Sequence, residues 1–454
     1  MPEPAEPDAA LAPPDAATDG PPAEVADGQL AASRDQSRDE PTDQPLSRNR
    51  DFLTLLVSQS VSAVGDAASV TAFPLLVLAL TGSGLAMGIV GAIETGADFL
   101  MGTIAGALAD RGDRKQMMLV ADFGRAFFTA LIPLSDVLHG PTMLVILLVS
   151  APLAILRGFF RAGYLAAMPN LVGRSQLARG NGVLETAYSA SFIVGPALAG
   201  FLVTTIGPAP TLAIDAASFA VSAVGLLLIH RELKAPADRA PSRIVDDIRE
   251  GVLYVARHPV LRTVILLFAT TSAVLTPVAA AMTFRVVRDL GQSPGAFGLT
   301  LTGLGVGTML GALFASRLDR DANVARVAVL AVFVMGVPLI VSAAIPSLLA
   351  IVVMSGLSGA GEAALVVLYV SVRAANSPDE LVGRVASTAR VMALGLMPIG
   401  SLVGGLLIDT VGGTATLAIL GVALCALALA FTQVRALRRA SLAPRSVRAE
   451  ETSA

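Results

Sequence analysis

The stretch GALADRGDRK, residues 106–115, lies between two long apolar runs and alternates acidic with basic side chains in its second half. A shorter version, SRLDR at residues 316–320, follows another apolar run in the second half of the chain. Six apolar runs belong to the half around the first stretch, and six belong to the half around the second. This internal repeat predicts two similar structural units in tandem.

Each apolar run is long enough to cross a bilayer, because a hydrocarbon core of roughly 30 Å takes about 20 residues of helix. The runs are 53–80, 85–109, 117–138, 142–168, 183–206 and 211–229, then 261–284, 296–316, 327–344, 348–372, 385–408 and 415–431. The chain is 54% hydrophobic and 15% charged, which excludes an ordinary soluble protein of this length. We therefore expect an all-α membrane protein of twelve transmembrane helices in two six-helix bundles.

Charge placement predicts the organisation along the chain and its orientation. The gaps on one side of the membrane are rich in Arg, and on the other side only Arg285 and Arg288 interrupt nearly bare gaps, so both termini are expected in the cytoplasm. The expected units are a disordered acidic tail at 1–47, an N-terminal bundle at 48–230, a cytoplasmic linker at 231–260, a C-terminal bundle at 261–432 and a cytoplasmic tail at 433–454. Within the linker, the amphipathic stretch 244–256 is expected to lie at the membrane surface.

Several chemistries find no support in the sequence. Cys425 is the only cysteine, so no intrachain disulfide can form. The three histidines lie far apart without metal-ligand spacing, and no phosphate-binding loop is present. We expect no enzyme, no cofactor, no metal and no nucleic-acid partner.

The stretch at 106–115 resembles the signature loop of the major facilitator superfamily. The resemblance implies a cytoplasmic gate made by Gly106, Asp110, Arg111, Asp113, Arg114 and Lys115. Glycine would let helices approach closely, and the alternating charges would form breakable contacts. The alternative is a basic loop that only fixes topology. In the second copy Ser316 replaces the first acidic residue, so the two gates are expected to be unequal.

The stretch GPALAG at 195–200 resembles an element that exporters of this superfamily carry in their fifth helix. Its residues Gly195, Pro196 and Gly200 would bend the helix and allow close contact between the halves. The stretches AAMPNLV at 166–172, DAASF at 215–219 and IREGVLY at 248–254 narrow the resemblance to the branch of macrolide efflux proteins and enterobactin exporters. This resemblance implies the major facilitator fold and export of a small molecule.

Ionisable residues at membrane depth are costly and therefore need a partner or a task. The candidates for proton coupling or the substrate cavity are Glu94, Asp98, Arg157, Arg161, Glu362 and Asp66. Glu94 and Asp98 lie one turn apart, a pairing suited to binding a proton. The alternative is a purely structural ion-pair network. Asp122 and Arg125 are expected to be packing residues at the cytoplasmic end, Asp215 a structural residue, and Glu185 a contact of the gate loop.

These observations predict a secondary active transporter in a bacterial plasma membrane. It would export an amphiphilic drug, antibiotic or siderophore by alternating access, as a monomeric antiporter with the proton as coupling ion. Two alternatives stay open: an importer of a small nutrient, and a lipid-handling or non-transporting membrane protein.

Overall fold

The structure is a computed structural model that describes residues 45–109, 112–140, 142–234, 244–317, 323–378 and 381–438. The expected acidic tail therefore lies almost wholly outside the described residues, as do Asp110, Arg111, residues 318–320 and most of the C-terminal tail.

The described secondary structure is helical throughout, apart from one bridge between Asp113 and Lys234. The first half contains η1 (Leu46–Arg48), α2 (Arg50–Thr81), α3 (Gly84–Ala109), α4 (Arg114–His139), α5 (Met143–Ile206) and α6 (Pro208–Leu228). The linker contains α7 (Ile244–Arg257). The second half contains α8 (Pro259–Leu275), α9 (Val278–Thr283), η2 (Phe284–Asp289), α10 (Pro294–Ala315), α11 (Val324–Ala344), α12 (Leu348–Ala375), α13 (Val382–Gly395), α14 (Met397–Thr432) and α15 (Arg435–Arg438).

Two of these helices contain a sharp turn and divide there into two membrane-crossing segments, the first segment of α14 together with α13. The 64-residue α5 would be about 96 Å long if it were straight, three times the hydrocarbon core. It turns at Gly173, whose φ of 71° is a left-handed conformation that suits glycine, and α14 turns in the same way at Gly412, with φ of 84°. The described residues contain eleven candidate spans when Val382–Thr432 is counted as one, and dividing that stretch at Gly412 gives twelve, so the expected two six-helix bundles are confirmed.

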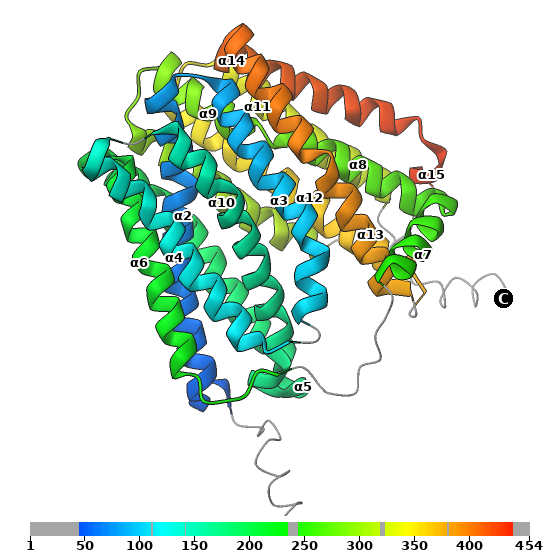
Figure 1. The fold of residues 1–454 in the computed structure, drawn as a ribbon. Helices are drawn as coiled ribbons and strands as arrows, with labels where there is room; N and C mark the ends of the chain where they lie inside the picture. Colours follow the sequence, from blue (N-terminus) through cyan, green and yellow to red (C-terminus); the bar gives the residue numbers. More distant parts are fainter. Residues whose placement is uncertain are drawn as a thin grey trace, which may run out of the picture.

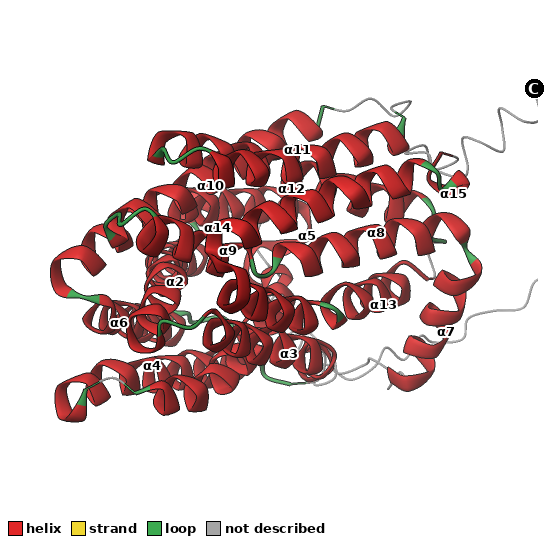
Figure 2. Ribbon diagram, turned by 90° about the horizontal axis from the view of Figure 1, so that it is seen from above, coloured by secondary structure: helices red, strands yellow, loops and turns green. Residues whose placement is uncertain are grey.

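The two bundles meet through two helix pairs, α3 with α14 and α5 with α10 (Figures 1 and 2). Small residues bring the paired backbones into contact. A Cβ added at Gly88 of α3 would lie 2.7 Å from the Ser401 carbonyl oxygen of α14, and one at Gly200 of α5 would lie 3.0 Å from the Gly295 Cα of α10. Glycine at these positions therefore permits the interface between the bundles.

The bundles are packed together at one end only. We call the end with residues 45 and 438 the termini end, and the opposite end, where α2 turns into α3, the far end. On one stripe of α5, Ser150 and Ala154 are buried towards the far end, whereas Arg157, Arg161 and Leu165 are exposed towards the termini end. The ribbons diverge towards the termini end in Figure 1. The space between the bundles is therefore open at the termini end and closed at the far end.

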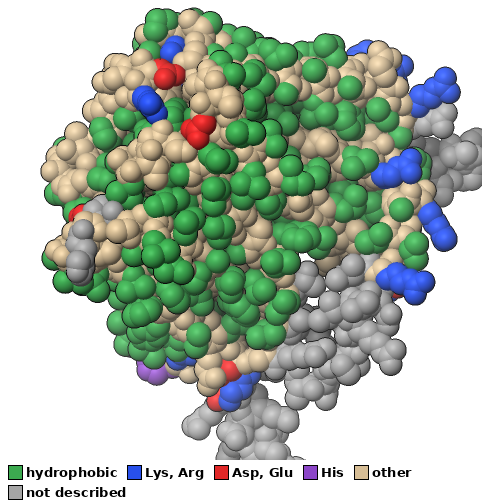
Figure 3. All heavy atoms as spheres, turned by 45° about the horizontal axis from the view of Figure 1, so that its top comes forward, with side chains coloured by type: hydrophobic (Ala, Val, Ile, Leu, Met, Phe, Trp, Pro, Cys, Tyr) green, Lys and Arg blue, Asp and Glu red, His purple; other side chains and the backbone are tan. Residues whose placement is uncertain are grey.

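The sides of the molecule are apolar, as a lipid-facing surface requires. Figure 3 shows hydrophobic side chains over most of this surface, with charged ones near its margins. Among the exposed residues are Phe127, Leu144 and Leu349, at 60%, 65% and 73%.

The amphipathic linker helix is placed differently from the expectation. α7 packs against α13 and α8, and the Glu250 carboxylate forms an ion pair with Arg384 of α13. A Cβ at Gly251 would lie 2.7 Å from the Arg384 carbonyl oxygen, so the missing side chain permits this close approach. Val255, on the same face, is 1% exposed. Part of the apolar side that we expected to face lipid faces the protein instead.

Candidate functional site

A group of charged residues lies halfway along the bundles, at their interface. We call Glu94 and Asp98 of α3, Arg157 and Arg161 of α5, and Arg390 of α13 the central cluster. Asp98 and Arg157 both lie about 21 Å along their helices from the far end, at 1.5 Å per residue. The predicted common depth of Asp98 and Arg157 therefore agrees with the helix bounds.

The charges of the central cluster face one another without direct pairing. Arg157 interacts electrostatically with Glu94 and Asp98, and Asp98 also interacts with Arg161 and Arg390. Within the described part of the chain, none of these five residues has a salt-bridge partner within 4.0 Å. The two carboxylates are half-buried and the arginines Arg157 and Arg161 are exposed to the open space. Charges held in this way can bind a proton or a charged ligand.

Arg390 and Tyr188 belong to this region and were missed by sequence reasoning. Arg390 is the second bundle's contribution, since it interacts with Asp98 and Arg161 of the first bundle. Tyr188 of α5 is 47% exposed and interacts electrostatically with Asp66 and Arg157. The available signal was a lone arginine within the apolar run 385–408.

Glu362 stands apart from the central cluster. It is exposed on α12, and no electrostatic partner of it is found among the described residues. It lies about two and a half turns beyond Val353, which is 50% exposed on the apolar outer side, so the two side chains are on opposite faces of the helix. Tyr369, two turns further along the face of Glu362, stacks on Phe268 of α8 at 4.2 Å. Glu362 therefore lies exposed on the face of α12 that is opposite Val353 and that carries Tyr369.

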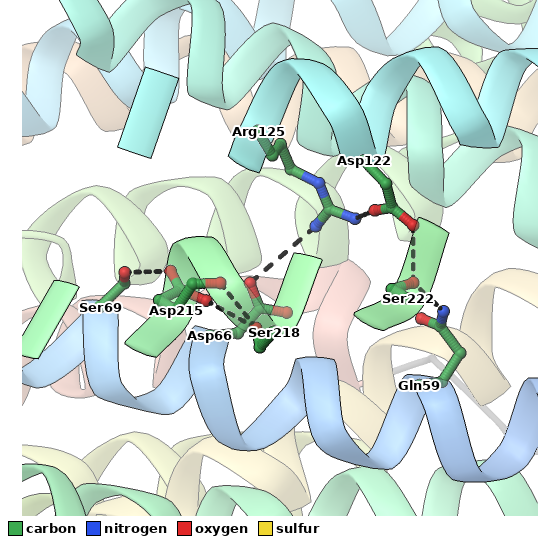
Figure 4. Close-up of polar contacts among 8 residues, drawn as sticks. All are labelled: Gln59, Asp66, Ser69, Asp122, Arg125, Asp215, Ser218 and Ser222. Atoms are coloured by element: carbon green, nitrogen blue, oxygen red, sulfur yellow. Dashed lines mark hydrogen bonds and ion pairs between the residues drawn. The ribbon is translucent and has the colours of Figure 1, made fainter. Parts of the chain in front are cut away.

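Asp66 interacts electrostatically with Arg157 of the central cluster and lies beside a buried arginine, as Figure 4 shows. Its carboxylate is 3.9 Å from the guanidinium of Arg125 on α4, which also pairs with Asp122. The rings of Phe160 and Phe219 lie 4.4 and 4.2 Å from the Arg125 guanidinium carbon. Arg125 is thus enclosed by two carboxylates and two aromatic rings, an arrangement that stabilises a buried cation.

The Arg125 site continues through hydrogen bonds to α6 and α2 (Figure 4). Ser222 donates to the Asp122 carboxylate at 2.6 Å, and the Gln59 amide donates to Ser222 at 2.7 Å. We call Arg125, Asp122, Ser222 and Gln59 the Arg125 network. Asp122 and Arg125 therefore join three helices, as packing residues do, but they lie about two to three turns inside α4 and not at its end.

Asp215 lies in the same interior. Its carboxylate accepts hydrogen bonds from Ser69 of α2 and, at 3.2 Å, from Ser218 of α6 (Figure 4). Asp215 is 1% exposed and interacts electrostatically with Asp66. These contacts agree with the expected structural role of Asp215 in joining α2 to α6.

Asp113, Arg114 and Lys115 of the expected gate loop have described contacts within their own bundle and with the beginning of the linker. Asp113 caps α4 by accepting from an amide of its first turn at 3.1 Å. Arg114 donates to the Asn170 side chain at 2.6 Å, and Lys115 donates to the Ile229 carbonyl oxygen, at the end of α6, at 2.6 Å. A Cβ at Gly106 would meet nothing within 4 Å, so the predicted close helix approach is not made in this open arrangement.

The beginning of the linker is fastened to this loop. Asp113 and Lys234 form the bridge, and the Arg114 amide donates to the Leu233 carbonyl oxygen at 3.0 Å. A hydrogen bond with Glu232 raises the pKa of Lys234 above its ordinary value. Glu185, the expected gate contact, instead lies exposed on α5 and interacts electrostatically with tyrosines.

The Gly-Pro element lies at the junction of both interfaces of α5. A Cβ at Gly195 would be 3.7 Å from the Val64 carbonyl oxygen of α2, within the same bundle. Gly200 and the Pro196 carbonyl oxygen face glycines of α10 in the other bundle. The predicted close contact between the halves is present here.

Comparison with known proteins places these features in a family. The family model described as transmembrane secretion effector matches residues 42–451. The chain is 28% identical over 400 residues to the multidrug efflux pump Tap of Mycolicibacterium fortuitum, which covers 86% of this chain and 97% of that protein. It is 22% identical over 401 residues to macrolide efflux protein A of Streptococcus pyogenes, covering 86% and 97%.

Solved transporter structures share the architecture. A crystal structure of a mutant of the nucleoside transporter NupG superposes with a TM-score of 0.72 at 13% identity, covering 85% of this chain and 100% of that chain. At this identity the likeness concerns the fold alone, which is that of the major facilitator transporters.

Proposed function

Because the chain belongs to the transmembrane secretion effector family of the major facilitator superfamily, we propose that it is a proton-coupled exporter of an amphiphilic small molecule. Its relatives include a multidrug and a macrolide efflux pump, which supports export of a drug-like compound. We place it in a bacterial plasma membrane as a monomer, with both termini in the cytoplasm. The division into bundles at 48–230 and 261–432 would then separate two rocking units.

The observation that carries this proposal is the central cluster. Two half-buried carboxylates, Glu94 and Asp98, lie beside exposed arginines in the space between the bundles. In a structural ion-pair network these groups would be directly paired, as they are around Arg125. Unpaired carboxylates at this depth can accept a proton, and protonation leaves Arg157 without its nearby negative charge. We assign Glu94 and Asp98 to proton coupling, Arg157 and Arg161 to control of their charge, and Glu362 to the substrate cavity.

The arrangement also suggests the place of this structure in the transport cycle. With the termini in the cytoplasm, the open end faces inward, and the compound would enter from the cytoplasm or inner leaflet. Proton binding from outside would favour its release to the exterior. The gate residues Asp113, Arg114 and Lys115, with Gly106, Asp110 and Arg111, would regain contacts across the bundles when the termini end closes.

The test is accumulation of lipophilic antibiotics and dyes in cells that express the protein. We expect lower accumulation than in empty cells, and we expect a protonophore to abolish the difference. Asp98→Asn should abolish it as well, since the amide cannot bind the coupling proton.

The matched control is Asp136→Asn, the same substitution at the far end of α4, outside the central cluster. It should leave export intact at equal membrane abundance. Export that continues in the double variant Glu94→Gln/Asp98→Asn would overturn the coupling assignment. Substrate uptake driven by the protein would overturn the direction.

A further inference from the structure

Two arginines at the far end interrupt gaps that are otherwise almost free of basic residues. Arg285 and Arg288 both belong to η2 of the second bundle. Figure 3 shows a small group of acidic and basic side chains at the end of the molecule that is turned forward, beside a largely apolar surface. Basic residues at the far end need an explanation, because Lys and Arg are concentrated in the loops on the cytoplasmic side of membrane proteins, where we expect the termini end.

Arg285 has an internal role. It is 7% exposed, and its guanidinium donates to the Ala343 carbonyl oxygen at 3.1 Å and to Thr414 at 3.0 Å. Asp289 accepts from the amide and hydroxyl of the same Thr414 at 3.0 and 2.5 Å. Together they join η2, α11 and α14 into one rigid rim of the second bundle.

Arg288 reaches across to the first bundle. Its guanidinium donates to the Gly82 carbonyl oxygen at 2.6 Å. Gly82 ends α2, so this carbonyl lies where the helix dipole is negative and a cation is favoured.

Asp409 of α14 contacts the other side of the same turn. Its carboxylate accepts from the Ser83 hydroxyl at 2.7 Å and from the amides of Gly84 and Leu85 at 2.5 and 3.1 Å. These amides open α3, so a carboxylate meets the positive end of that helix. Arg288 and Asp409 therefore hold both ends of the turn between α2 and α3.

We propose that Arg288 and Asp409 form a far-end latch that keeps the two bundles closed on that side and must break before the far end can open. Beneath the latch, Gly88 and Gly91 of α3 pack directly against Ser401 of α14. This close packing excludes water only while the two helices stay together. The latch extends the proposed function, because alternating access requires this interface to separate once per cycle.

The experiment reads opening directly from the accessibility of a buried position. In a Cys425→Ser background, Ser401→Cys places the only thiol at a site that is 4% exposed although the termini end is open. A maleimide then labels the detergent-purified protein without substrate or proton gradient. We expect Asp409→Asn to raise the labelling rate by about tenfold, because a charged acceptor of three hydrogen bonds is lost.

The control is Asp289→Asn, an equally exposed carboxylate of the same end whose contacts stay within the second bundle. It should leave labelling near the parent rate. Should Asp409→Asn not yield monodisperse protein, Arg288→Gln tests the latch from its other side. Parent-like labelling in the latch variant, or an equal increase in Asp289→Asn, would overturn the proposal. Since the assay needs no transport, a failure of export would leave it unaffected.

Discussion

Arg125 and Arg157 both interact electrostatically with Asp66 in the first bundle, yet their surroundings are opposite. Arg125 is 4% exposed, pairs with Asp122 and is covered by two aromatic rings. Arg157 is exposed to the space between the bundles, and none of its acidic neighbours comes within ion-pair distance among the described residues. In the sequence both residues are arginines within apolar runs, so the sequence does not distinguish them.

The difference distinguishes a charge that holds helices together from a charge that can change its partners when a proton or a ligand binds. A directly contacting buried ion pair has one stable arrangement, and removing one member leaves the other uncompensated. A charge with nearby but unpaired partners can exchange them when a proton or a ligand arrives. Asp66 interacts electrostatically with both arginines, so it is the residue through which the central cluster would act on the Arg125 network.

The largest effect should come from Arg125→Met. It leaves Asp122, which is 0% exposed, as a buried charge without its cation, at a cost of about 3–5 kcal/mol. We expect a strong fall in yield and in the Tm of the purified protein. Arg125→Lys keeps the positive charge, so its yield and Tm should fall clearly less than those of Arg125→Met. Equal yield and Tm for Arg125→Met and the parent would remove the structural role.

Arg157→Met should show the opposite pattern. Export should fall by about tenfold or more, since ~1.4 kcal/mol of lost differential interaction suffices for that. The Tm should change little, because no direct pair is broken. Dye efflux and Tm measured on the same preparation decide the question. A variant that unfolds like Arg125→Met would erase the distinction between the two arginines.

A smaller effect tests whether Arg390 links the bundles. Dye-binding affinities of the purified parent, Asp98→Asn, Arg390→Gln and the double variant, measured without a proton gradient, form a thermodynamic cycle. We expect a coupling energy of about 1 kcal/mol, because the two side chains interact electrostatically across the bundle interface. The cycle Asp98→Asn with Arg384→Gln, on the same helix α13 but near α7, should give additive effects. Additivity in the first cycle would remove Arg390 from the central cluster.

The smallest effect on export is expected at the edge of the Arg125 network. Ser222→Ala removes the hydrogen bond to Asp122 and the acceptor of the Gln59 amide, and should lower stability by about 1–2 kcal/mol with export unchanged. The control Ser60→Ala removes only a bond to its own helix and should be nearly silent. A loss of export in Ser222→Ala at normal abundance would show that the network takes part in transport.

The sequence was sufficient for the architecture because its causes are local. Apolar runs of membrane length, the repeated loop at 106–115 and 316–320, and glycines at the helix interfaces all act through simple length and size rules. The same rules predicted that Glu94, Asp98 and Arg157 lie in one region, since the depth of a residue in the membrane follows from its number of residues along the helix.

What the sequence could not give are relations between distant helices. The enclosure of Arg125 depends on Phe160 and Phe219 from two other helices, and Arg390 joins the cluster from the opposite bundle. The docking of α7 depends on the close approach of Gly251 to the backbone of Arg384. Contacts of this kind follow from packing in three dimensions, to which spacing along one chain gives no access.

The linker is anchored at both ends, and this sets a mechanical limit. Lys234 is bridged to Asp113 of the first bundle, and α7 is paired through Glu250 with Arg384 of the second. The short stretch between Lys234 and Ile244 can reach no further than about 35 Å even when fully extended. The chain length therefore sets an upper limit on the separation of these two anchor points, and shortening the stretch would lower that limit.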